Sequence, residues 1–114
     1  MNNETKWRKM LSWLRRNYPV KMKVTIRRVR NLRKKEPNIG YSEGTNRSIY
    51  IAIDYNTSFA LQCDTLLHEW AHVMTWDGND IDEHGEEWGL AYARIYRLFV
   101  AWDYGRAKPT HDGD

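Results

Sequence analysis

The sequence has little cysteine and no long apolar run, and both absences narrow the class of protein. Its one cysteine, Cys63, excludes an internal disulfide and gives no sign of secretion. No apolar run approaches the roughly 20 residues that a membrane span requires. The first residues lead into a charged amphipathic stretch and not into the apolar core of a signal peptide. We therefore expect a cytoplasmic protein without a membrane partner.

Acidic residues are scarce in the N-terminal half. Most of the 18 Lys and Arg residues lie at positions 1–60 and most of the 15 Asp and Glu residues follow them. The formal net charge of +3 therefore hides two halves of opposite sign. A basic half favours an anionic partner, with nucleic acid as the first candidate. An ordinary solvated surface explains the same charges, so DNA binding through this half is one of two interpretations.

The chain is short, which limits it to one domain. Its 114 residues are too few for two domains, and a hydrophobic fraction of 41% excludes an intrinsically disordered chain. We expect a single domain over residues 1–105. Residues 106–114 are polar and contain Pro and Gly, so we expect a flexible tail that carries His111 as a surface residue.

The spacing of apolar residues predicts a helix followed by strands. Apolar positions recur at helical spacing from about residue 5 to 17, and Pro19 disfavours helix in the residue before it. From Val20 to Arg27 apolar and polar residues alternate, which predicts a strand with one cationic face. Residues 39–41 are a candidate short strand, and a turn at 44–46 precedes a second alternating segment at 47–54.

Two further helices are predicted, from about 58 to 76 and from about 84 to 104. Each carries one apolar stripe at helical spacing, formed by Cys63, Leu66, Leu67, Trp70 and Met74 in the first and by Trp88, Ala91, Tyr92, Ile95, Phe99 and Trp102 in the second. Helices and strands are segregated along the chain. The expected class is α+β, with an N-terminal helix, a two- or three-stranded antiparallel sheet and two C-terminal helices.

The segment His68-Glu69-Trp70-Ala71-His72 lies inside the first of these two helices. A spacing of four residues places both imidazoles on one face of the helix, one turn apart, where they can share one metal ion. Zinc at such a site lowers the pKa of its water to about 7, and Glu69 can take the proton as general base. A chance match on an ordinary helix is the competing interpretation. The chain has only 4 histidines, which makes such a match rare.

A catalytic zinc needs a third protein ligand, and His84 is the first candidate. It follows His72 by twelve residues, after a polar segment that can fold back over the metal. Its acidic neighbours can orient the imidazole as hydrogen-bond acceptors. Asp82, Glu86 and Glu87 are alternative ligands, since some enzymes with this motif use a carboxylate. His84 as a solvent-facing residue near a helix start is the remaining interpretation.

The metal motif and the later segment His84-Gly85-Glu86-Glu87-Trp88 together resemble the SprT-like (Spartan-type) zinc metallopeptidase domains. The resemblance is close over residues 65–90 and extends loosely to the order of helices and strands. It implies a small zincin-like domain that binds one Zn²⁺ per chain. The implied metal ligands are His68, His72 and His84, and the implied catalytic residue is Glu69.

The resemblance also implies a substrate and a place for it. The strand at 47–54 should edge the cleft and pair with an extended substrate peptide through its free N–H and C=O groups. Members of that family cut proteins bound to or crosslinked on DNA, which the basic N-terminal half is compatible with. The sequence departs from many relatives in having no Cys-x-x-Cys, so it shows no zinc ribbon that could read DNA separately.

The leading functional hypothesis is therefore a zinc-dependent endopeptidase that acts on protein or peptide substrates, including DNA-associated proteins. A non-catalytic, zinc-stabilised module that binds nucleic acid or a regulatory protein is an alternative. A regulatory peptidase with a single repressor-like partner is another. Glu69 is the residue that a non-catalytic module has least use for, so its presence favours an enzyme.

Overall fold

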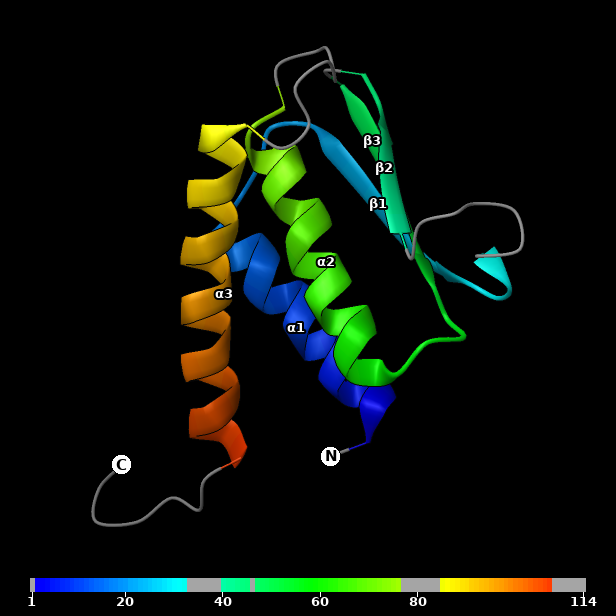
Figure 1. Ribbon diagram of the computed structural model, residues 1–114, viewed down its shortest axis with the longest axis vertical. Coiled ribbons are helices and arrows are strands. Elements are labelled where there is room, and N and C mark those ends of the chain that lie inside the picture. Colours follow the sequence, from blue (N-terminus) through cyan, green and yellow to red (C-terminus); the bar gives the residue numbers. More distant parts are fainter. Residues whose placement is uncertain (1, 33–39, 46, 77–84, 108–114) are drawn as a thin grey trace.

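A computed structural model describes residues 2–32, 40–45, 47–76 and 85–107 of the chain. The elements are α1 (Asn3–Asn17), β1 (Lys23–Val29), β2 (Gly40–Gly44), β3 (Ser48–Asp54), α2 (Phe59–Met74) and α3 (Glu86–Ala107). Helix α2 stands between α3 and the three-stranded sheet (Figure 1). The expected α+β class is confirmed.

Helix α1 begins two residues before its predicted start. The side chain of Asn2 accepts a hydrogen bond of 2.8 Å from the amide of Thr5, which satisfies one of the free N–H groups of the first turn. The helix ends as predicted at Asn17, where Tyr18 follows as C-cap just before Pro19. The N-cap thus supplies the boundary that apolar spacing alone does not show.

The sheet is mixed, with strand order β1-β3-β2, so the prediction of an antiparallel sheet is wrong for one of its two pairings. Strands β2 and β3 pair antiparallel as a hairpin, whereas β1 and β3 pair in parallel from Lys23↔Ser48 to Val29↔Asp54. After β1 comes β2, which lies at the opposite edge of the sheet, and β3 then lies between the two. Alternation of apolar residues assigns faces to a strand but not its direction, so the sequence pattern could not show this.

Strand β3 is the central strand, which corrects the expectation that the segment 47–54 edges a cleft. Both of its edges are paired, so it has no free row of N–H and C=O groups for a peptide. Its alternating Ile49, Ile51 and Ile53 are buried as expected, and Ala52 on the opposite face is buried too. Among the described strands, β1 and β2 are the outer ones.

The core is continuous and collects the predicted helical stripes. Leu66, Leu67 and Trp70 of α2 are fully buried, and Ile95 of α3 packs with them. The indole N–H of Trp70 donates a hydrogen bond of 3.1 Å to the carbonyl of Tyr18, so α2 is tied to the end of α1. The predicted stripes on α2 and α3 are therefore confirmed as the packed faces.

Helix α3 continues to Ala107, beyond the predicted end near residue 104. Residues 106 and 107 thus belong to the helix and not to the expected tail. The rest of that predicted tail, residues 108–114, lies outside the described residues.

Two glycines should respond in opposite directions to replacement by alanine. A Cβ at Gly40 of β2 would lie 2.7 Å from Cγ2 of Thr65 and 2.9 Å from the carbonyl oxygen of Ala52, so Gly40→Ala should lower the free energy of unfolding by about 1–3 kcal/mol. A Cβ at Gly89 of α3 meets nothing within 4 Å, so Gly89→Ala should raise it by about 0.5–1 kcal/mol. Equilibrium urea unfolding measures both, and a Gly40→Ala chain as stable as wild type would contradict the close packing of β2 on α2.

Candidate metal centre

The segment His68–His72 is helical because α2 is capped at both ends and packs one apolar face on the core. The hydroxyl of Ser58 accepts a hydrogen bond of 3.2 Å from the amide of Leu61 at the start. At the other end the hydroxyl of Thr75 donates to the carbonyl of Ala71 at 3.0 Å. The motif lies in the last two turns of the helix and is held by the core on the opposite side.

The imidazoles of His68 and His72 lie side by side on α2, as predicted. Their ring centroids are 5.0 Å apart and the ring planes are inclined by 65°. Zinc–nitrogen bonds of about 2.0–2.1 Å in a tetrahedral site place the centroids of two imidazole ligands about 5 Å apart. The separation of the two rings is therefore compatible with two ligands of one zinc ion.

Glu69 lies next to this pair and is buried, with 5% of its surface exposed. Its Oε2 is 3.9 Å from Nε2 of His68, which is within ion-pair range and longer than a hydrogen bond. The packing around Glu69 thus holds a carboxylate beside the two imidazoles. That is the placement a general base at a metal site requires.

Aromatic side chains of α3 cover the histidine pair. The ring of Trp88 stacks on His72 with centroids 5.2 Å apart and meets His68 edge-on at 4.9 Å. Its indole N–H also donates a hydrogen bond of 3.2 Å to the carbonyl of His68. The sequence placed Trp88 in the apolar stripe of the last helix, but did not show its contacts with both histidines.

A second aromatic residue, one turn further along α3, continues this layer. Tyr92 stacks on Trp88 at 5.3 Å and meets His68 edge-on at 5.7 Å. Its hydroxyl donates a hydrogen bond of 2.5 Å to Asp64, one turn before His68 on α2. Burial, together with this hydrogen bond, raises the pKa of Tyr92 far above its usual value, so the hydroxyl keeps its proton and stays a donor.

The third ligand is not placed by the structure. His84, the first candidate, and Asp82 lie outside the described residues. Glu86 and Glu87 are in the first turn of α3 and exposed to solvent. Within the described ranges, no three His, Cys, Asp or Glu side chains gather closely enough to hold a metal ion. The described part of the site is thus the histidine pair with Glu69, and the third ligand stays a prediction.

Cys63 belongs to the core, as predicted from its place around the helix. It is buried on the apolar face of α2, and burial raises the pKa of its thiol to about 11. Its place in the core, on the face of α2 that packs against other elements, separates Cys63 from the histidine pair.

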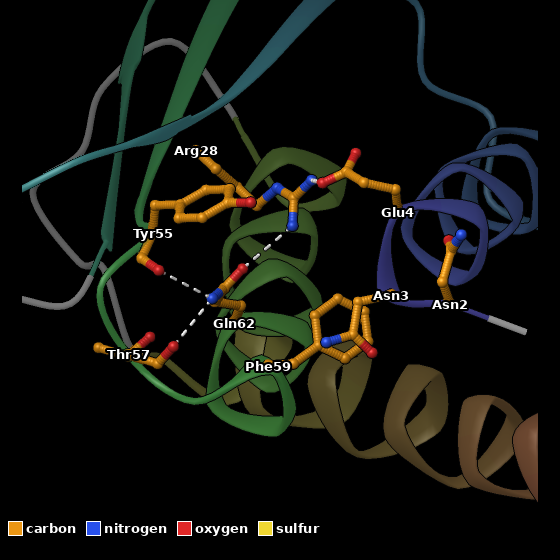
Figure 2. A pocket seen from close by; sticks show the side chains of 8 residues that line it. All are labelled: Asn2, Asn3, Glu4, Arg28, Tyr55, Thr57, Phe59 and Gln62. Carbon is orange, nitrogen blue, oxygen red and sulfur yellow. Dashed lines mark hydrogen bonds and ion pairs between the residues drawn. The ribbon is translucent and has the colours of Figure 1, made fainter.

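One cation of the basic half is used to build the fold. The guanidinium of Arg28 lies over the rings of Trp7 at 4.5 Å and Tyr55 at 4.9 Å, and it donates a hydrogen bond of 3.3 Å to Gln62. Glu4 forms an ion pair with it, so α1, β1 and α2 meet at this residue (Figure 2). The charge of the N-terminal half is therefore not all free for an anionic partner.

The pocket in Figure 2 is distinct from the candidate metal centre. Phe59 and Gln62, from the first turn of α2, line it together with the start of α1. His72 follows Gln62 by ten residues on the same helix, which corresponds to about 15 Å along the axis. The metal motif therefore lies toward the other end of α2.

Comparisons with known proteins give no independent support for a family. No protein-family model matches the chain, and no curated protein or solved structure matches it either. Among the helices of the described residues, none is both long and apolar enough to cross a membrane.

Proposed function

We propose that the chain is a zinc-dependent endopeptidase in which His68 and His72 hold the metal together with a third ligand, His84 in the first instance. The observation that carries this proposal is the imidazole pair at 5.0 Å with the buried carboxylate of Glu69 beside it. Paired histidines alone would suit any structural zinc site. A buried carboxylate that can accept a proton next to them is what favours hydrolysis over a purely structural role.

Each described residue of the site has a definite task in this proposal. A zinc ion held here would supply Lewis-acid activation of water and of the substrate carbonyl. Glu69 takes the proton from the attacking water and passes it to the departing amine. His68 and His72 would bind the zinc ion as neutral imidazoles. Trp88 and Tyr92 shield one side of them from solvent.

The proposed substrate is a protein or peptide in extended conformation. Since β3 has no free edge, an added peptide strand would pair with β2, the outer strand that packs on α2. Gly40 of β2 approaches Thr65, one turn before His68, so β2 lies close to the metal helix. A peptide along β2 would therefore run near the proposed metal.

DNA-associated proteins are the narrower substrate class in the proposal. Arg8, Lys9 and Arg16 of α1 and Arg27 of β1 are exposed and supply the positive surface that this requires. Affinity for duplex DNA that does not change with salt concentration would remove nucleic acid from the proposal.

The metal content of the purified chain tests the metal site directly. We expect one zinc per chain in the wild type by elemental analysis, and strongly reduced zinc in His84→Ala, because a two-histidine site retains metal poorly. Unchanged zinc in His84→Ala would transfer the third position to Asp82, Glu86 or Glu87. A wild type prepared without chelators that holds no zinc and takes none up would overturn the proposed function.

A further inference from the structure

Four rings from two helices form one ordered layer at the candidate metal centre. The rings of Tyr92, Trp88 and His72 follow one another as a stack, each inclined by 23° to the next at centroid distances of 5.3 and 5.2 Å. The ring of His68 stands against all three at 65–67°. Both histidine rings are thus set at defined angles by the two aromatic rings of α3.

Hydrogen bonds fix both members of the α3 pair relative to α2. The indole N–H of Trp88 donates to the carbonyl of His68 at 3.2 Å, and the hydroxyl of Tyr92 donates to Asp64 at 2.5 Å. The two acceptors are one helical turn apart on α2, as the two donors are on α3. The two hydrogen bonds therefore fix where each ring sits along α2, in addition to the ring contacts themselves.

We infer that Trp88 and Tyr92 are positioning residues, which hold the imidazoles of His68 and His72 in the orientation for sharing one metal ion before the metal arrives. This inference rests on the proposed function, since it takes the histidine pair as metal ligands. Stacking on Trp88 limits rotation of the His72 ring about its side-chain bonds. The edge contacts of both aromatic rings limit rotation of His68 in the same way.

Preorganisation of this kind has a measurable consequence for metal affinity. Residues that orient a ligand without touching the metal typically contribute 10–100-fold to metal affinity. We expect Trp88→Leu to weaken Co²⁺ binding by about that factor and to change the visible absorption of the bound Co²⁺. Tyr92→Phe keeps the ring and loses the anchor to Asp64, so its effect should have the same direction and be smaller.

A matched control separates positioning from general destabilisation. Trp102 is another tryptophan of α3, packed on Trp13 at 5.7 Å and Phe99 at 5.6 Å, and about 21 Å further along the helix than Trp88. Trp102→Leu removes a similar apolar area from the same helix. It should lower the thermal stability but leave the Co²⁺ affinity and spectrum unchanged.

Proton NMR of the metal-free chain tests the positioning without any metal. The stacked indole should shift the ring protons of His72 upfield in the wild type and in Trp102→Leu, and the shift should be lost in Trp88→Leu. Where Trp88→Leu does not fold, Trp88→Phe takes its place: its ring is smaller and the N–H donor is lost, so the upfield shift of the His72 protons should be reduced relative to the wild type and not abolished.

The outcomes distinguish this inference from the proposed function. A wild type that binds neither Co²⁺ nor Zn²⁺ would overturn the proposed function and this inference with it. A wild type that binds metal, shows the upfield-shifted His72 protons and cleaves no peptide would overturn the proposed function alone. Equal Co²⁺ affinity and spectra in the wild type, Trp88→Leu and Trp102→Leu would overturn the positioning role while the metal site stands. Unshifted His72 protons in the metal-free wild type would also overturn it.

Discussion

Glu69→Gln should lower the rate of peptide hydrolysis by orders of magnitude while the zinc content and the fold stay as in the wild type. Glutamine has nearly the volume of glutamate, so a side chain that is 5% exposed is replaced without opening a cavity. Its amide cannot accept a proton from water at neutral pH. General-base catalysis typically contributes about 10²–10⁴-fold to the rate, and we expect a loss of that size.

The measurement is a single-turnover cleavage assay on an unfolded protein substrate, with zinc analysis of the same samples. Glu4→Gln is the matched control, because it makes the same chemical change on α1 at an exposed carboxylate that pairs with Arg28. It should cleave at the wild-type rate. Wild-type activity in Glu69→Gln would show that the general base is another group. A wild type that binds zinc and cleaves no substrate would favour the non-catalytic binding module.

The second large effect concerns the metal and the stability together. His72→Ala should lose zinc and, with it, the stabilisation that zinc gives to the folded chain. At a metal concentration 1,000-fold above the dissociation constant, binding to the folded state alone contributes about 4 kcal/mol. The variant also loses the stack of the imidazole on Trp88, worth about 0.5–1.5 kcal/mol. Thermal unfolding followed by circular dichroism, with zinc and with chelator, separates the two contributions.

With zinc, the midpoint of His72→Ala should lie well below that of the wild type, and with chelator the two should differ only by the lost ring contact. His111→Ala is the control for removal of a histidine, since the sequence places His111 outside the predicted domain. It should match the wild type in both buffers. An equal difference between His72→Ala and the wild type with and without zinc would show that His72 does not bind metal.

The sequence predicted the helices of this fold better than its sheet. Helical spacing identified the buried faces of α2 and α3, because a stripe around one helix axis is a local property. Strand direction and order are not local. The alternating isoleucines of β3 are buried whichever neighbours pair with it, so the pattern could not show that β1 joins in parallel or that β3 is central.

In the candidate site, too, the sequence predicted the local features and not those that depend on how the helices pack. Four-residue spacing was enough to bring His68 and His72 to one face, and the structure has their rings 5.0 Å apart. The ring layer formed with Trp88 and Tyr92 depends on how α3 packs against α2, which the period of either helix does not fix. The role of His84 stays a prediction, since that residue lies outside the described ranges.

The charge pattern predicted the sign of the surface charge, but not which cations are exposed. Counting cations predicted a basic surface, and α1 and β1 do expose several. It could not show that Arg28 is enclosed by Trp7 and Tyr55, because the side chains that cover it come from separate elements. Contacts with nucleic acid must therefore be sought among the exposed cations and not among all Lys and Arg residues of the N-terminal half.

The first and the last helix of the described residues, α1 and α3, pack together, and this limits how the protein could be divided. Lys6 of α1 forms an ion pair of 3.0 Å with Asp103 of α3, and Trp13 packs on Trp102. The central β3 pairs with β1 on one side and with β2 on the other. A fragment that starts at α2 would carry the whole metal motif and leave its apolar stripe without α1 or the sheet. A graft of residues 68–72 into another scaffold would therefore have to supply an apolar surface for the stripe of α2, as α1 and the sheet do here.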